Sequence, residues 1–130
     1  MNAESKKFIE SYITSYNHFD IERMLEDLAE NIEFENISNG KSDLKIQGKQ
    51  NFRDQAVRAA GIFSERKQTI LTWKEIQHGD FEEIEIDIDY YGKLSQDLPN
   101  GLKKGAVLEL KGKSIFKIEV QKIKSIQDYS

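Results

Sequence analysis

The chain has 130 residues, a formal net charge of −4 and no cysteine. This length suffices for one hydrophobic core, so we expect residues 1–130 to form a single domain. The lack of cysteine excludes a disulfide framework and thiolate chemistry, and the acidic balance argues against general nucleic-acid binding. No apolar run has the length of a signal peptide or a membrane span, so we expect a cytoplasmic protein without a membrane partner.

The N-terminal half of the sequence has the periodicity of helices interrupted by one short hairpin. Apolar residues recur at helical spacing from Phe8 to Tyr16, and Asp20 is a good N-cap for a second helix. Polarity then alternates as in a strand, and Asn39-Gly40 is a turn signal before a short return strand. The expected elements are helices over residues 8–16 and 21–28, strands over residues 31–37 and 44–46, and a third helix after Gly48.

The C-terminal half has the pattern of a four-stranded meander. If Gly79-Asp80 is a two-residue hairpin turn, Trp73 lies opposite Ile86. By the same register, Lys74 lies opposite Glu85 on the other face, where an acidic stripe meets a lysine stripe. The expected strands cover residues 68–78, 81–91, 106–118 and 123–129, and the expected inward side chains of the first two are Leu71, Trp73, Ile84, Ile86, Ile88 and Tyr90.

Three segments resemble the NTF2-like (SnoaL-like) superfamily. They are residues 28–36 (LAENIEFEN), 105–116 (GAVLELKGKSIF) and 119–123 (EVQKI), and the expected order of elements matches over essentially the whole chain. The resemblance implies an α+β, NTF2-like cone. In that fold three helices from the N-terminal half pack on a strongly curved six-stranded mixed β-sheet, and the first strand runs parallel to the last. One fold hosts many reactions, so the resemblance does not imply a particular one.

The positions at which relatives carry acid–base residues are occupied differently in this sequence. Where steroid-isomerase relatives have a general-base aspartate, the resemblance places Asn36, whose amide cannot take up a proton. Where polyketide-cyclase relatives have a histidine and an aspartate on adjacent strands, it places Tyr90 and Ser114. A free tyrosine has a pKa of about 10 and serine is higher still, so neither is a ready base near neutrality. Catalytic residues are therefore unknown at this point.

A set of polar and aromatic side chains is expected to face the inside of the cone. Four polar residues would either bond one another or line a wet cavity. A helix tyrosine could point its hydroxyl into a pocket or pack in the core, and two aromatic residues could form a ligand wall or belong to the core. The pocket candidates are the polar residues Asn36, Tyr90, Ser114 and Gln127, the tyrosine Tyr16, and the aromatic residues Trp73 and Phe116.

Metal and cofactor chemistry have no support in the sequence. His18 and His78 are far apart, and neither has a carboxylate at a recognisable ligand spacing, so we expect no metal site. The single glycines match no phosphate-binding loop, and no other motif indicates a cofactor.

Three functions are open on this sequence. The favoured hypothesis is a protein that binds an unknown small apolar or amphipathic molecule in an apolar pocket lined by a few polar groups. The alternative is an enzyme of the isomerase, cyclase or hydrolase type that uses a noncanonical polar set, so enzymatic activity is uncertain. The second alternative is a protein-interaction module whose cone is filled by its own side chains.

Outward isoleucines predict self-association. If Val120-Gln121 is a two-residue turn, Ile115 lies opposite Ile126 on the outer face of the sheet. Ile70 and Ile76 are expected nearby, which is more apolar surface than a solvated face needs. The resemblance also implies dimerisation through this face, and the charged stripes could pair across a two-fold axis. We therefore expect a homodimer that buries Ile115 and Ile126.

Overall fold

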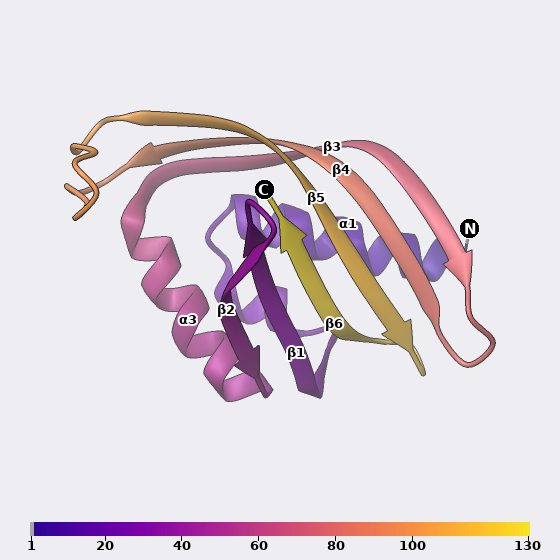
Figure 1. Ribbon diagram of the computed structural model, residues 1–130. Coiled ribbons are helices and arrows are strands. Elements are labelled where there is room, and N and C mark those ends of the chain that lie inside the picture. Colours follow the sequence, from indigo (N-terminus) through magenta and orange to yellow (C-terminus); the bar gives the residue numbers. More distant parts are fainter. Residues whose placement is uncertain (1) are drawn as a thin grey trace.

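The computed structural model describes residues 2–130 as three helices packed on one curved sheet (Figure 1). The elements are α1 (Ala3–Asn17), α2 (Ile21–Leu25), β1 (Leu28–Ser38), β2 (Lys41–Gln47), α3 (Lys49–Ile62), β3 (Phe63–Gln77), β4 (Glu82–Leu94), β5 (Val107–Glu119) and β6 (Lys122–Tyr129). The strand order is β2-β1-β6-β5-β4-β3, with β1 parallel to β6 and all other neighbours antiparallel. The expected α+β architecture with a six-stranded mixed sheet is confirmed. None of the described helices is long and apolar enough to cross a membrane.

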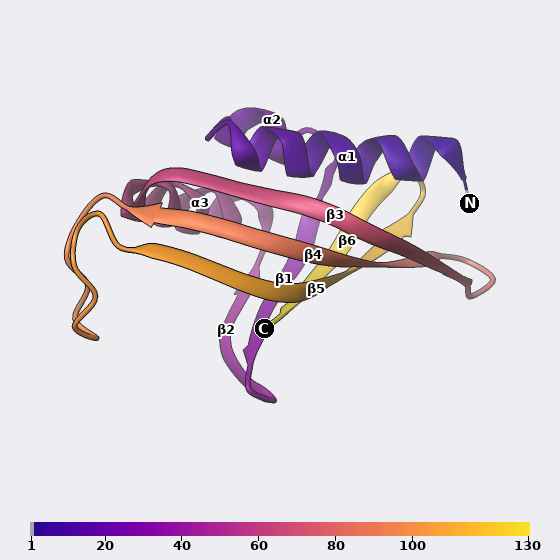
Figure 2. The same cartoon turned by 90° about the horizontal axis from the view of Figure 1, so that it is seen from above.

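Helices α1 and α2 form a layer over one face of the sheet (Figure 2). Helix α1 begins after Asn2, whose side-chain oxygen accepts hydrogen bonds from two backbone N–H groups of the first turn. At the other end, the Asn17 side chain donates to the carbonyl oxygen of Gln68 at 3.1 Å and accepts from its N–H at 2.7 Å. This double hydrogen bond holds the last turn of α1, which carries Tyr16, against β3.

The β3–β4 hairpin has the expected register around its turn. Trp73 pairs with Ile86 and Lys74 pairs with Glu85, as the two-residue turn predicted. Ile84 and Ile86 are fully buried beneath the helices. Burial of one such side chain contributes about 1.5–3 kcal/mol, so these residues decide which face of the sheet points inward.

A β-bulge in β3 reverses the expected facing of the N-terminal half of this strand. The register shifts between Ile70 and Thr72, which leaves Leu71 as the extra residue. Leu71 is 48% exposed, whereas Ile70 packs against the core, so the expectations that placed Leu71 inward and Ile70 outward are wrong. The same shift turns Arg66 and Gln68 inward, where both are buried.

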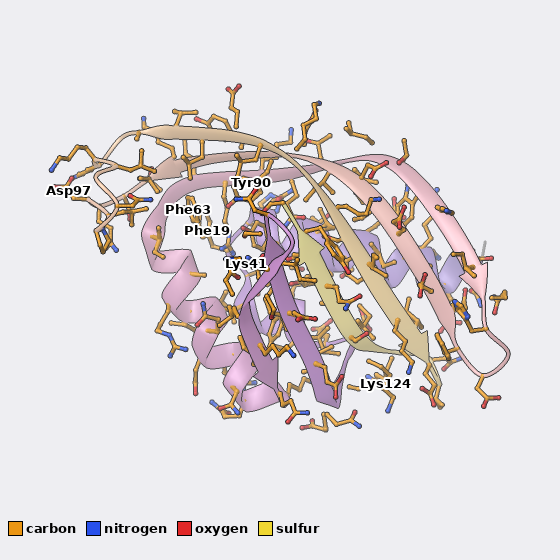
Figure 3. All side chains as sticks on the ribbon, viewed as in Figure 1. Phe19, Lys41, Phe63, Tyr90, Asp97 and Lys124 are labelled. Carbon is orange, nitrogen blue, oxygen red and sulfur yellow. The ribbon has the colours of Figure 1, made fainter. Side chains whose placement is uncertain are left out.

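A second bulge changes the facing of most of β6. The turn before β6 has two residues as expected, but the register then shifts and leaves Lys124 (labelled in Figure 3) without a partner on β5. Ile115 therefore pairs with Gln127 rather than with Ile126. Ile126 lies in the core and is 1% exposed, so the expectations that placed it outside and Gln127 inside are wrong. The shift also turns Asp128 inward.

Candidate ligand-binding cone

Two adjoining chambers, both open to solvent, lie on the inner side of the sheet. Residues of all three helices line the helix-side chamber, whereas Tyr16 of α1 and residues of the strands line the strand-side chamber. The helix-side chamber has a volume of about 220 Å³, and the strand-side chamber has a volume of about 310 Å³. Tyr16, Asn36 and Asp128 line both, so these three polar residues stand where the chambers meet. The helix-side wall also contains Tyr12, Met24, Phe34, Leu44, Ile46, Phe52, Gln55, Ala56, Ala59 and Arg66, and the strand-side wall includes Phe63, Gln68, Ile88, Tyr90, Leu108, Leu110 and Ser114.

A pair of tyrosines connects helix α1 to strand β4 at this junction. The hydroxyl oxygens of Tyr16 and Tyr90 lie 2.8 Å apart, and either can be the donor. Phe63 packs edge-on against Tyr90, and Figure 3 shows these two residues and Phe19 at the same end of the cone. Burial raises the pKa of both tyrosines above the ordinary value, and their mutual hydrogen bond lowers that of Tyr16 in part. Both hydroxyls are therefore protonated near neutrality, and one proton of the pair is not used in the bond between them.

A serine and an aspartate on neighbouring strands form the second polar pair. The Ser114 hydroxyl on β5 donates to the Asp128 carboxylate on β6 at 2.6 Å. Burial raises the pKa of Asp128 to about 6, although the Ser114 hydrogen bond acts in the opposite direction. Asp128 thus changes charge close to neutral pH while facing both chambers.

Arg66 is a buried cation in the wall of the helix-side chamber. Its Nε donates to the carbonyl oxygen of Tyr16 at 2.8 Å, in the last turn of α1, and the same oxygen accepts from the backbone N–H of Phe19 at 3.1 Å. Its guanidinium lies 3.7 Å from the centre of the Tyr16 ring and 4.5 Å from that of Phe19. Phe19 follows α1 with a left-handed φ of 59°, a conformation that places its ring under the arginine at the cost of some backbone strain.

Asn36 joins this junction to the hairpin that β1 forms with β2. Its amide nitrogen donates to the Ser38 hydroxyl at 3.3 Å and to the Asp43 carboxylate at 2.9 Å. Both donors of the amide are therefore engaged at the rim of the cone, and its orientation is fixed.

Comparisons with known proteins identify the architecture. No protein-family model matches the chain, and no curated protein matches it at a significant level. A candidate SnoaL-like polyketide cyclase from Jannaschia sp. superposes with a TM-score of 0.77 at 8% identity, covering 96% of this chain and 83% of that one. A hypothetical protein from Catenulispora acidiphila with a ketosteroid isomerase-like fold, solved with trimethylamine, gives 0.71 at 14% identity over 95% and 84%. A candidate scytalone dehydratase from Novosphingobium aromaticivorans gives 0.75 at 8% identity over 95% and 78%.

The chain has the NTF2-like fold. The match extends over 95–96% of this chain in these structures, and it confirms the fold that the resemblance in the sequence implied. Identities this low establish the architecture alone, because one fold hosts many functions.

The NTF2-like cone brings four of the seven pocket candidates together and places three elsewhere. Tyr16, Asn36, Tyr90 and Ser114 all line the strand-side chamber. Phe116 is buried against the ring of Tyr12, and Trp73 packs on the core beneath the ammonium of Lys6; neither lines a chamber. Gln127 lies on the outer face of the sheet. That any of these residues contacts a ligand stays a prediction.

Three polar residues of the NTF2-like cone were not anticipated from the sequence. Arg66, Gln68 and Asp128 lie beyond the two bulges, in stretches where strict alternation points to the wrong face. Asp128 takes the inward place that was expected for Gln127, and Arg66 and Gln68 add a cation and an amide that the sequence reasoning did not place there. Among residues 2–130, no group of three or more His, Asp or Glu side chains has the arrangement of a metal site.

Proposed function

We propose that this protein binds a small apolar or amphipathic molecule inside the cone. The observation that carries the proposal is the junction of the two chambers, where Tyr16, Asn36 and Asp128 lie beside the largely apolar wall of the helix-side chamber. Ligand sites in proteins combine an apolar lining with a few placed polar groups, and this arrangement has both. Open space in the cone also speaks against the alternative of an interaction module with a filled interior.

A fluorescent probe and two matched substitutions test the proposal. N-phenyl-1-naphthylamine is uncharged and apolar, and its emission rises in an apolar site. We expect saturable binding by the wild type and loss of binding in Ala59→Trp, because Ala59 lines the helix-side chamber. Val57→Trp is the control, since Val57 is 55% exposed on the same helix. Equal binding by the two variants would contradict the proposed site, and no binding by the wild type would contradict the function.

Proton-transfer catalysis is a second candidate function, and the Asp128 carboxyl favours it. A group with a pKa of about 6 can act as a general base near neutrality. The protonated Tyr16–Tyr90 pair could donate a hydrogen bond to a carbonyl oxygen that gains charge in the same step. The proposed substrates are ketosteroids, polyketide-like carbonyl compounds or epoxides. Turnover by the wild type that is lost in Asp128→Asn, with probe binding retained, supports this role; a wild type without turnover on the panel contradicts it.

We further propose a homodimer through the outer face of the sheet. A groove of about 690 Å³ crosses this face and is lined by Phe81, Ile115 and Gln127 among others. Carboxylates such as Glu33 and ammonium groups such as Lys117 border it, so two copies could pair opposite charges across a two-fold axis. Ile126 also lines the groove but is only 1% exposed, so it offers almost no surface to this contact. A monomeric wild type in sedimentation equilibrium would contradict the proposal.

Two broader expectations also stay predictions. A single-domain chain should unfold in one cooperative transition that different probes report alike. A cytoplasmic location should appear as co-fractionation with cytoplasmic markers in the cells that make the protein.

A further inference from the structure

Arg66 is a buried cation without a carboxylate partner in the described part of the chain. The side chain is 5% exposed, and its terminal nitrogen Nη2 is buried without a hydrogen-bond partner among residues 2–130. Buried charges in proteins are normally paired, because removal of an ion from water costs several kcal/mol. Burial of this arginine therefore lacks the compensation that a neighbouring carboxylate would give.

The contacts of Arg66 within the chain hold it in place but do not use its terminal donors. The rings of Tyr16 and Phe19 interact with the guanidinium through its π-face and offset part of the burial cost. The hydrogen bond from Nε to the Tyr16 carbonyl oxygen fixes the direction of the group. The N–H groups of a guanidinium lie in its plane, so stacking on the two rings provides no acceptor for the terminal nitrogen Nη2.

The surroundings of Arg66 indicate which kind of ligand group could pair with its guanidinium. Arg66 lines the helix-side chamber, whose wall is otherwise largely apolar, with side chains such as Phe34 and Phe52. Asp128 lines the same chamber but forms no ion pair with Arg66, and its carboxylate is held by Ser114 instead. A guanidinium fork matches a planar carboxylate, which accepts two parallel hydrogen bonds.

We infer that the ligand of this chamber is a monocarboxylic acid with an apolar body, and that Arg66 binds its carboxylate. The inference rests on the proposed function and adds the chemical class of the ligand to it. The acid group accepts hydrogen bonds from the free edge of the guanidinium, and the apolar body lies against the aromatic and aliphatic wall. A single acidic group is favoured, because the described wall of this chamber offers one basic side chain, Arg66, and already contains the acidic Asp128.

A matched pair of probes tests the inference. 4-Phenylbutyrate and its uncharged amide, 4-phenylbutyramide, differ only in the group that Arg66 would bind. By isothermal titration calorimetry we expect the wild type to bind the acid at least about tenfold tighter than the amide, the size of a charged hydrogen bond. Arg66→Met should bind the two probes equally. Lys67→Met is the control, because it removes the same charge from the next residue on the opposite, exposed face of β3 and should keep the preference.

The outcomes separate this inference from the function on which it rests. Equal affinity of the wild type for acid and amide, or an acid preference that survives in Arg66→Met, overturns the inference and leaves the proposed function standing. Binding of neither phenylbutyl probe, with N-phenyl-1-naphthylamine still bound, also overturns the inference alone. Loss of binding of all three compounds contradicts the proposed function. Should Arg66→Met not fold, the Arg66 Nε–H resonance of the ¹⁵N-labelled wild type must shift with the acid and not with the amide.

Discussion

Replacement of Asp128 by asparagine is expected to stabilise the protein in a pH-dependent manner. In the folded protein, burial raises the pKa of Asp128 from its ordinary value of 3.8 to about 6. Each pKa unit corresponds to about 1.4 kcal/mol, so the ionised carboxylate destabilises the folded state by about 3 kcal/mol once the pH exceeds both values. The side-chain amide of the Asp128→Asn variant would keep an oxygen that accepts the Ser114 hydrogen bond but would carry no charge.

The sign of the pH dependence follows from proton binding. Because the folded pKa lies above the unfolded one, the folded state binds more protons between about pH 4 and pH 6. Stability of the wild type therefore falls through this window as the pH rises, relative to a chain without the group. Asp128→Asn should gain about 3 kcal/mol over the wild type at about pH 8 and almost nothing at about pH 3.5.

Urea unfolding at the two pH values measures this difference directly. The free energy of unfolding is extrapolated linearly to water for wild type and variant under identical conditions. Asp80→Asn is the control, because Asp80 is exposed on the hairpin turn between β3 and β4 and should show no comparable gain. A variant that is less stable than the wild type at about pH 8, or a gain of equal size at both pH values, would refute the reasoning.

Two pairs of substitutions test the packing of the sheet. A Cβ added at Gly112 would lie 2.9 Å from the backbone oxygen of Tyr129, so Gly112→Ala should lower the free energy of unfolding by about 1–3 kcal/mol. A Cβ added at Gly61 in α3 meets no atom within 4 Å, so Gly61→Ala should raise the free energy of unfolding by up to about 1 kcal/mol. Urea unfolding midpoints measure the effect of both glycine substitutions. Ile126→Lys places a charge in the core and should lower the free energy of unfolding by at least about 4 kcal/mol, which circular dichroism would show as loss of the folded state. Ile115→Lys should leave folding intact and weaken only self-association, which sedimentation equilibrium would show. A folded, stable Ile126→Lys variant would contradict the β6 register.

The architecture could be predicted from the sequence because the alternation of apolar and polar residues is regular wherever the strand pairing is regular. Strict alternation in β4 and the glycine-containing turn before it predicted the hairpin register, and the pairing of Trp73 with Ile86 confirms it. Turn residues and helical spacing likewise located the remaining elements. These features depend on local periodicity, which a single sequence displays directly.

The site was only partly predictable because two bulges interrupt that periodicity. A bulge adds one residue and reverses the facing of everything beyond it. Extrapolation of the alternation therefore placed Gln127 inside the cone in place of Asp128, and it missed Arg66 entirely. A signal was present: Ile123 and Ile126 are three positions apart, and a regular strand cannot turn both to one face. Ile70 and Trp73 have the same spacing around Leu71.

The central claim is that the cone interior, and not the outer face of the sheet, receives the ligand. Methyl-labelled protein titrated with N-phenyl-1-naphthylamine tests this by nuclear magnetic resonance. The account predicts saturable shifts for the methyl groups of Met24 and Leu44, which line the helix-side chamber, and none for the exposed Leu71 or for Ile115 on the outer face. Shifts confined to Leu71 and Ile115, with Met24 and Leu44 unchanged, would contradict it.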